Sequence, residues 1–208
     1  MSYRNRRRMD GDMNHRADID RVARAAGHFA GTMIDEFQHR NRPSWYPRGR
    51  NVSSELGDSR DPRNNQVMTV PFVRKTGLLR PNNIIFICGV PHQKANRFTV
   101  YLQQGNSHEP SLVAMCVDAR FDFGNDRNIV LRNHKDGSWG REEKQLSYFP
   151  FKPNESFEMI ILVERNRFMV AVNNKHMLEF NHRIRALGDI DTLRIDGDVT
   201  LTQFRIQD

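Results

Sequence analysis

The chain has 208 residues and a formal net charge of +7, and hydrophobic residues make up 38% of it. This length allows one domain with an extension or two very small domains, and the mean hydropathy of -0.72 predicts that part of the chain builds no core. No apolar run reaches the length of a transmembrane helix, and the basic first residues lead into no apolar run. We therefore expect neither a membrane span nor a secretory signal.

Residues 1–66 are predicted to form a mostly disordered, basic segment. They carry 13 Lys and Arg against 9 Asp and Glu, a balance of +4, whereas residues 67–208 carry 19 against 16, a balance of +3. The stretch 41–66 is rich in Asn, Arg, Pro, Ser and Asp and has few aliphatic residues, which does not support a packed core. The segment is a candidate for contact with nucleic acid or an anionic membrane, and a solvated tail is the favoured alternative.

One stretch of this segment, residues 18–38, has the periodicity of a short amphipathic helix. Asp18 is a candidate N-cap, and apolar residues recur at helical spacing: Ile19, Val22, Ala26, Phe29, Met33 and Phe37. Gly27 and Gly31 each weaken such a helix by about 1 kcal/mol relative to Ala. The helix either packs on a partner or domain or forms only transiently, and both alternatives stay open.

From Val67 onward, apolar runs of strand length are separated by Gly, Pro, Asn and Asp. These runs are 84–88, 98–102, 112–117, 129–131, 157–163, 168–172, 193–195 and 199–206. The last run alternates apolar and polar residues, as a half-buried strand does. Short strands with regular turns predict an all-β, antiparallel sandwich or barrel over residues 67–208, and a segment of this size can build one core.

Two turns are predicted from local sequence. Asn173 and Asn174 separate two strand runs and are expected to form a hairpin turn. Asp196 and Gly197 lie between the last two runs, and an Asp-Gly pair favours a tight hairpin turn there as well.

The residues 116–144 contain the side chains needed to bind a sugar. Alternate residues of a strand share a face, so Cys116, Asp118 and Arg120 are expected to point one way. If the run 129–133 pairs alongside, Asn133 can lie near Arg120. An Arg between carboxylates is fixed by charge-assisted hydrogen bonds, and we expect those carboxylates to be Asp118 and Glu142.

Trp139 lies in a turn context, next to Gly140 and among hydrogen-bonding side chains. If Glu142 and Lys144 follow on the next strand, they face the same side as Trp139. A flat, exposed aromatic ring takes the apolar face of a sugar, while fixed polar groups bind its hydroxyls. A shallow polar groove on one sheet is therefore expected. The alternatives are a core Trp and a surface ion network.

Over residues 67–208 the sequence resembles the galectins, a family of β-galactoside-binding lectins. The family pattern runs H-x-N-P-R-F, then V-x-N, then W-G-x-E-x-R. The corresponding stretches here are Cys116–Phe121 (CVDARF), Leu131–Asn133 (LRN) and Trp139–Lys144 (WGREEK). The resemblance implies an antiparallel jelly-roll sandwich of the galectin and concanavalin type. It also implies a non-enzymatic lectin without a cofactor, whose partners are β-galactosides, related glycans or glycoconjugates.

Carried over by position, Trp139 would stack on galactose, and the candidate carbohydrate-binding residues would be Asp118, Arg120, Asn133, Trp139, Glu142 and Lys144. Several positions depart from the family pattern: Ala119 replaces Pro, which is a backbone change, and three others change polar side chains. Cys116 replaces His, Asp118 replaces Asn and cannot donate while ionised, and Lys144 replaces Arg and lacks its planar fork. The alternative function is therefore a galectin-fold protein with a degraded sugar site that acts through protein contacts.

Other classes of site find little support. The eight His residues show no metal-ligand spacing with the two cysteines, and Cys88 and Cys116 are expected to be reduced, buried thiols of a cytoplasmic protein. Export by a non-classical route is the alternative location. Two carboxylates of a glycosidase would differ in ionisation, whereas an Arg between Asp118 and Glu142 keeps both ionised. We expect no catalytic residues, no metal, and self-association as the means of presenting more than one sugar site.

Overall fold

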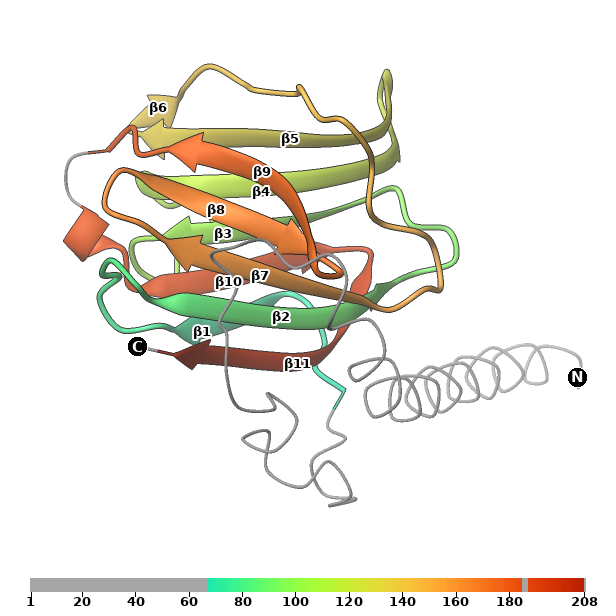
Figure 1. Cartoon of the computed structure of the whole chain (residues 1–208), viewed down its shortest axis with the longest axis horizontal. Helices are drawn as coiled ribbons and strands as arrows, with labels where there is room; N and C mark the ends of the chain where they lie inside the picture. The colour runs from blue at the N-terminus through green and yellow to red at the C-terminus, as the bar shows by residue number, and fades with distance from the viewer. Residues whose placement is uncertain (1–66, 185–186, 208) are drawn as a thin grey trace, which may run out of the picture. The chain divides into compact units, whose positions relative to one another are not determined.

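The computed structural model describes residues 67–184 and 187–207. The predicted basic segment 1–66 and its helix at 18–38 lie outside the described residues, so the expectations for them stay predictions. Within the described part, eleven strands form two antiparallel sheets that pack face to face (Figure 1). The all-β sandwich predicted from the spacing of apolar runs is confirmed.

The six-stranded sheet has the order β1-β10-β3-β4-β5-β6. Its strands are β1 (Phe72–Lys75), β10 (Thr192–Gly197), β3 (Arg97–Gln103), β4 (Leu112–Phe123), β5 (Asp126–Asp136) and β6 (Ser138–Trp139). The five-stranded sheet has the order β11-β2-β7-β8-β9. Its strands are β11 (Val199–Gln207), β2 (Ile84–Pro91), β7 (Phe157–Val163), β8 (Arg167–Val172) and β9 (Lys175–Asn181), and a short 3-10 helix, η2 (Leu187–Asp189), precedes β10.

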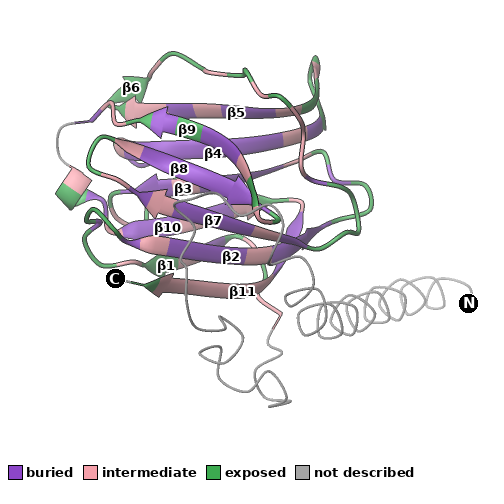
Figure 2. Ribbon diagram, in the orientation of Figure 1, coloured by how far each residue is buried: buried purple, intermediate pink, exposed green. Residues whose placement is uncertain are grey.

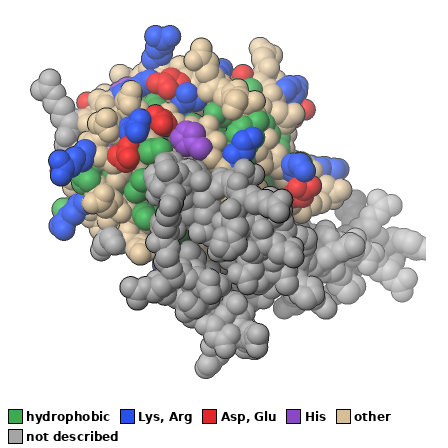
Figure 3. All heavy atoms as spheres, in the orientation of Figure 1, with side chains coloured by type: hydrophobic (Ala, Val, Ile, Leu, Met, Phe, Trp, Pro, Cys, Tyr) green, Lys and Arg blue, Asp and Glu red, His purple; other side chains and the backbone are tan. Residues whose placement is uncertain are grey.

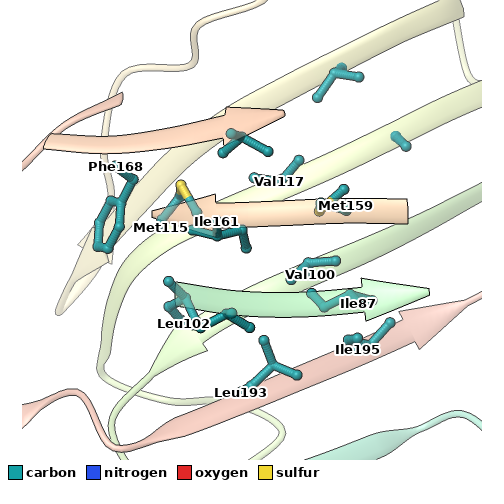
Figure 4. Packing of buried hydrophobic residues seen from close by; sticks show 14 of the residues in the cluster. Ile87, Val100, Leu102, Met115, Val117, Met159, Ile161, Phe168, Leu193 and Ile195 are labelled. Carbon is teal, nitrogen blue, oxygen red and sulfur yellow. The ribbon is translucent and has the colours of Figure 1, made fainter. Parts of the chain in front are cut away.

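The core lies between the inner faces of the two sheets. Alternate residues of each central strand point inward, and Figure 4 shows Val100, Leu102, Met115 and Val117 of one sheet packed against Ile87, Met159, Ile161 and Phe168 of the other. Figure 2 shows the same pattern as burial concentrated in the middle strands of both sheets. Burying such side chains contributes roughly 1.5–3 kcal/mol each before entropy is counted.

An aromatic cluster joins the two sheets near the loop that follows β6. The ring of Phe98 stacks on that of Phe157 at 5.3 Å and meets the edge of Phe151 at 5.0 Å. Phe149 packs in turn against Phe121 and Phe151. The chain after Trp139 is therefore anchored in the core by Phe149 and Phe151, which limits how far residues 140–148 can move.

The turn predicted at Asn173 is confirmed. Val172 pairs with Lys175 across β8 and β9, and both asparagines have positive φ, 50° and 62°. Two consecutive residues with positive φ are the signature of a type I′ hairpin, which matches the twist of antiparallel strands.

The hairpin predicted at Asp196 and Gly197 is wrong. β10 belongs to the six-stranded sheet and β11 to the five-stranded sheet, so the chain crosses between layers at this point. The crossing is held by Asp198, whose backbone nitrogen donates to the Arg97 carbonyl at 2.8 Å and whose carboxylate accepts from the Asn96 nitrogen at 2.8 Å. A dipeptide reports the local backbone conformation but not which sheet the next strand joins.

Gly197 is needed at this crossing. Its φ is +100°, and a Cβ there would lie 2.5 Å from the backbone oxygen of Arg97. We expect Gly197→Ala to lower the free energy of unfolding by about 2 kcal/mol or more, measured by urea denaturation. The matched control is Gly188→Ala, where a Cβ meets nothing within 4 Å; its expected effect is below about 0.5 kcal/mol. Equal losses in both variants would contradict this account of the crossing.

Candidate functional site

The outer face of β4 carries the polar side chains predicted for the site. Val117, Ala119 and Phe121 are buried in the core, so the intervening Cys116, Asp118 and Arg120 point to the other side of the sheet. A register shift between Val113 and Cys116 sets which residues alternate outward from that point on. The predicted division of β4 into two faces is confirmed.

Asp118 is the buried centre of this face. Its residue is only 2% exposed, and both carboxylate oxygens accept from neighbouring side chains. Thr99 Oγ1 donates to Oδ1 at 2.9 Å, Arg97 Nε lies 3.2 Å from Oδ1, and Arg120 Nε donates to Oδ2 at 2.9 Å. Asp118 therefore orients two guanidinium groups, and its oxygens are already occupied by protein donors.

Arg120 continues the network to Asp126 at the start of β5. Its Nη1 donates to the Asp126 carboxylate, and Lys144 Nζ lies 3.3 Å from the same carboxylate. The hydrogen bond from Arg120 lowers the pKa of Asp126, and Lys144 adds to that effect. Burial alone would lower the pKa of Arg120, but its bonds to Asp118 and Asp126 outweigh burial and raise it. Both groups are thus held in their charged forms.

Glu142 ends this series of alternating charges. Its carboxylate lies 3.4 Å from Lys144 Nζ, and its side chain is 49% exposed. The second carboxylate that holds Arg120 is thus Asp126, and the prediction that Glu142 has this role is wrong. Glu142 and Lys144 were expected on a strand next to β5, but residues 140–148 form no regular strand. They pair with β5 only through an isolated bridge between Arg132 and Glu143.

Asn133 lies opposite Cys116 on β5, whereas Arg120 lies opposite Ile129. The expected proximity of Asn133 to Arg120 is therefore wrong by about four residues of register, or roughly 13 Å along a strand. Asn133 is 4% exposed, and its Nδ2 donates to the Gly140 carbonyl at 2.8 Å. This bond fixes the turn that carries Trp139.

Trp139 presents its ring to solvent. It is 51% exposed, lies opposite Lys135 in the β5 and β6 register, and has Lys135 Nζ 5.9 Å from its ring centroid. The ring of His134 lies against Gly140, where an added Cβ would meet its Cε1 at 2.0 Å. An exposed indole on a braced turn is suited to stacking on a flat apolar surface.

Cys116 lies between the charge network around Asp118 and the turn that carries Trp139, because it precedes Asp118 on β4 and lies opposite Asn133 on β5. It is 5% exposed and lies opposite Tyr101 on β3 and Asn133 on β5. Burial, and secondarily the charge of Asp118, raises the pKa of the thiol, so it stays protonated. A thiol is a weak donor and acceptor, so this position adds little polar recognition.

Sequence reasoning missed Arg97, Thr99, Phe123 and Asp126. The Arg97 guanidinium lies 4.5 Å from the Phe123 ring centroid and that of Arg120 lies 5.3 Å from it, while Phe123 is 39% exposed. Arg97 could have been predicted from its strand, because it alternates with the buried Phe98 and so points to the outer face of β3, next to β4. Nothing in the sequence pairs Asp126 with Arg120, because that contact depends on the β4 and β5 hairpin register.

This arrangement is a polar surface with oriented donors and two exposed aromatic rings, those of Trp139 and Phe123. A cavity of about 560 Å³ lies elsewhere on the sheet, lined by Val73, Arg74, Lys75, Asn106 and Thr192. Among residues 67–184 and 187–207, no group of three or more His, Cys, Asp and Glu side chains could hold a metal ion. The same part of the chain has no helix long and apolar enough to span a membrane.

A buried carboxylate that holds two cations should be costly to remove. We expect Asp118→Ala to lower the free energy of unfolding by about 3 kcal/mol, because Arg97 and Arg120 lose their shared partner. The matched control on the same strand is Asp122→Ala, which removes an exposed ion pair with Arg127 at 2.7 Å and should cost less than about 1 kcal/mol. Urea denaturation of both variants measures the difference, and a loss at Asp118 no larger than at Asp122 would refute its anchoring role.

Comparison with known proteins defines the class of this fold and site. The model of the galactoside-binding lectin family matches residues 71–206. Two relatives are galectin-3 of Cricetulus longicaudatus, 39% identical over 136 residues, and galectin-3 of Mus musculus, 40% identical over 136 residues. Each alignment covers 65% of this chain, with 53% of the first relative and 49% of the second.

Galectin-8 of Rattus norvegicus is more distant, at 34% identity over 139 residues, covering 66% of this chain and 42% of the relative. Among solved structures, sheep galectin-11 in complex with glycerol superposes with a TM-score of 0.59 at 27% identity, covering 67% of this chain and 99% of that one. This chain belongs to the galactoside-binding lectin family, as the three motif stretches predicted. It spans about half the length of the galectin-3 relatives it matches.

Proposed function

We propose that this lectin-family chain binds β-galactosides or related glycans, free or on glycoconjugates, on the outer face of the six-stranded sheet. The observation that carries the proposal is the half-exposed ring of Trp139 on the same sheet as a network of fixed charges that ends at Glu142, three residues further along the chain. The indole would stack on the apolar face of the sugar, and no covalent chemistry is involved.

The polar groups have complementary roles. Arg120 uses Nε and Nη1 for Asp118 and Asp126, and no described residue hydrogen-bonds its Nη2, which can donate to a sugar hydroxyl. Glu142 supplies an exposed acceptor and Lys144 an exposed donor. Each such bond competes with water and gains only about 1 kcal/mol net, so directional groups that are fixed before binding matter most.

The departures from the family pattern define how strong this binding can be. Asp118 has both oxygens occupied, Cys116 offers a weakly polar thiol, and Asn133 uses one amide hydrogen on Gly140. A site that is built to bond a hydroxyl loses discrimination when its partners are absent. We therefore propose weak binding of simple β-galactosides or a preference for a related glycan.

Trp139→Ala tests the stacking role. The natural chain should be retained on lactose-agarose and eluted by free lactose. Burying one face of an indole is worth about 1–2 kcal/mol, so the variant should bind roughly tenfold more weakly by titration calorimetry. Leu78→Ala is the control, because Leu78 is an exposed apolar residue outside the site. Absence of both lactose retention and any glycan-array signal for the natural chain would refute lectin activity.

The second candidate function is a galectin-fold protein that acts through protein contacts, with a sugar site that has decayed. Cys116 and the occupied carboxylate of Asp118 favour it, since both weaken polar recognition. In this case, cross-linking of partners would rest on self-association, as it would for a lectin with one site. A cytoplasmic location, or export by a non-classical route, is proposed for either function.

Restoring the family residues separates the two candidates. If the site has decayed, Cys116→His with Lys144→Arg should create lactose retention that the natural chain lacks, because imidazole and guanidinium supply the missing directional bonds. Cys116→Ser with Lys144→Arg is the matched control and should not restore it. Tight lactose binding by the natural chain would rule out the decayed site.

A further inference from the structure

The segment that follows β6 lies beside the six-stranded sheet without forming a strand of it. Residues 140–148 pair with β5 through the backbone bridge of Glu143 with Arg132, in which both N–O distances are 2.9 Å. The bond from Asn133 to the Gly140 carbonyl fixes one end of this segment. A segment with so little sheet pairing opens easily unless side chains hold it.

The side chains of this segment point to two sides. The backbone is extended where Glu143 pairs with Arg132, and alternate residues of an extended chain lie on opposite faces. Arg132 lies opposite the core residue Val117 and so points toward the other sheet, and its Nε donates to the Glu143 carboxylate at 3.1 Å. Glu142 and Lys144, on either side of Glu143, form an ion pair with each other at 3.4 Å on the polar face. Glu143 therefore marks the back of the segment, and Glu142 and Lys144 its front.

A residue of the other sheet binds the back of the segment. Arg183 follows β9, the edge strand of the five-stranded sheet. Its Nη1 donates to the Arg141 carbonyl at 2.6 Å, and its Nη2 donates to the Glu143 carboxylate. Figure 3 shows acidic and basic side chains mixed at the upper left of the molecule, where Figure 1 places β6 and the end of β9. The planar fork of a guanidinium makes two such bonds together in a fixed geometry, which an ammonium does not.

Arg183 is itself held firmly. Its guanidinium lies 4.7 Å from the ring centroid of Phe180, a core residue that is 1% exposed. The preceding residue, His182, donates from its backbone nitrogen to the Asn166 carbonyl at 2.9 Å. The His182 ring also packs on Phe168, with the two ring centroids 4.5 Å apart. A side chain that is locked by packing and hydrogen bonds in this way can hold a binding group in place.

We propose that Arg183 is a positioning residue of the sugar site, which holds residues 141–143 from behind so that Glu142 and Lys144 keep their directions before a sugar binds. Arg183 does not contact the sugar. Its effect on affinity rests on the proposed function, whereas the ordering of the segment can be measured without a sugar. Groups that are fixed before binding avoid the entropy cost of being ordered by the ligand.

The ring of His134 lies against Gly140 and reports on the same contact. Burial lowers the pKa of His134, the positive charge of Arg183 lowers it further, and Asp136 raises it. We therefore expect Arg183→Met to raise the pKa of His134, measured by NMR titration of its Cε1 proton. An unchanged pKa would contradict the placement of Arg183 behind the turn.

Heteronuclear NOE values of the backbone amides of residues 141–144, recorded without sugar, test the ordering. In Arg183→Met we expect them to fall from values of rigid backbone to those of a flexible loop. Arg183→Lys keeps the charge and one of the two bonds, so it should give intermediate values. The matched control is Arg167→Met, because Arg167 belongs to the same sheet and also pairs with two groups, Glu164 and Glu179. The control should match the natural chain, and circular dichroism checks that each variant is folded.

Titration calorimetry with lactose, or with the strongest ligand of a glycan array, measures the effect on affinity. Arg183→Met should bind about tenfold more weakly, Arg183→Lys should lie between it and the natural chain, and Arg167→Met should bind like the natural chain. Rigid amides at 141–144 in Arg183→Met would overturn the proposal, and so would a loosened segment with unchanged affinity. A natural chain that binds no glycan would instead refute the proposed function, because the NOE comparison still decides the role of Arg183.

Discussion

The buried carboxylate of Asp118 is the constraint on which the site depends. A charge that is 2% exposed is tolerated only when it is paired and hydrogen-bonded, and Asp118 meets this condition with donors from β3 and β4. The guanidinium groups of Arg97 and Arg120 are thereby held in place on the outer face of the sheet. Arg120 in turn donates a hydrogen bond to Asp126. Lys144 forms ion pairs with both Asp126 and Glu142. One buried group thus orders a surface that extends to the loop after Trp139.

Much of the fold and part of the site could be predicted from sequence because both rest on local periodicity. The division of β4 into a core face and a polar face follows from alternation alone. The contact of Arg120 with Asp126 could not be predicted, because it depends on how the β4 and β5 hairpin aligns. The same limit explains Asn133, which was expected near Arg120 and lies opposite Cys116. Strand pairing is a non-local property, and a register change of one residue reverses the faces.

The two outer faces of the sandwich differ in a way that the sequence records. The run at β4 alternates into Asp118 and Arg120, whereas the runs at β2, β7 and β8 are apolar at nearly every position. Continuous apolar strands are typical of sheets that are covered on both sides. The apolar residues of these strands form one contiguous surface only because the strands pair with each other in the same sheet. No single strand shows that surface.

The charges of the polar face also bear on the class of ligand. The network contains three cations and three carboxylates, namely Arg97, Arg120 and Lys144 with Asp118, Asp126 and Glu142. The chain as a whole carries +7, yet the formal charges of these six network residues balance to zero. A balanced network presents directional donors and acceptors without a net field, which suits a neutral polyol better than a sulfated or acidic glycan. Asp118, which stands where the family pattern has Asn, brings a negative charge to this network, and Arg97 Nε lies 3.2 Å from its carboxylate. An ionised Asp118 accepts hydrogen bonds and donates none, so it alters the hydrogen-bond chemistry of the site while these six residues together carry no net formal charge.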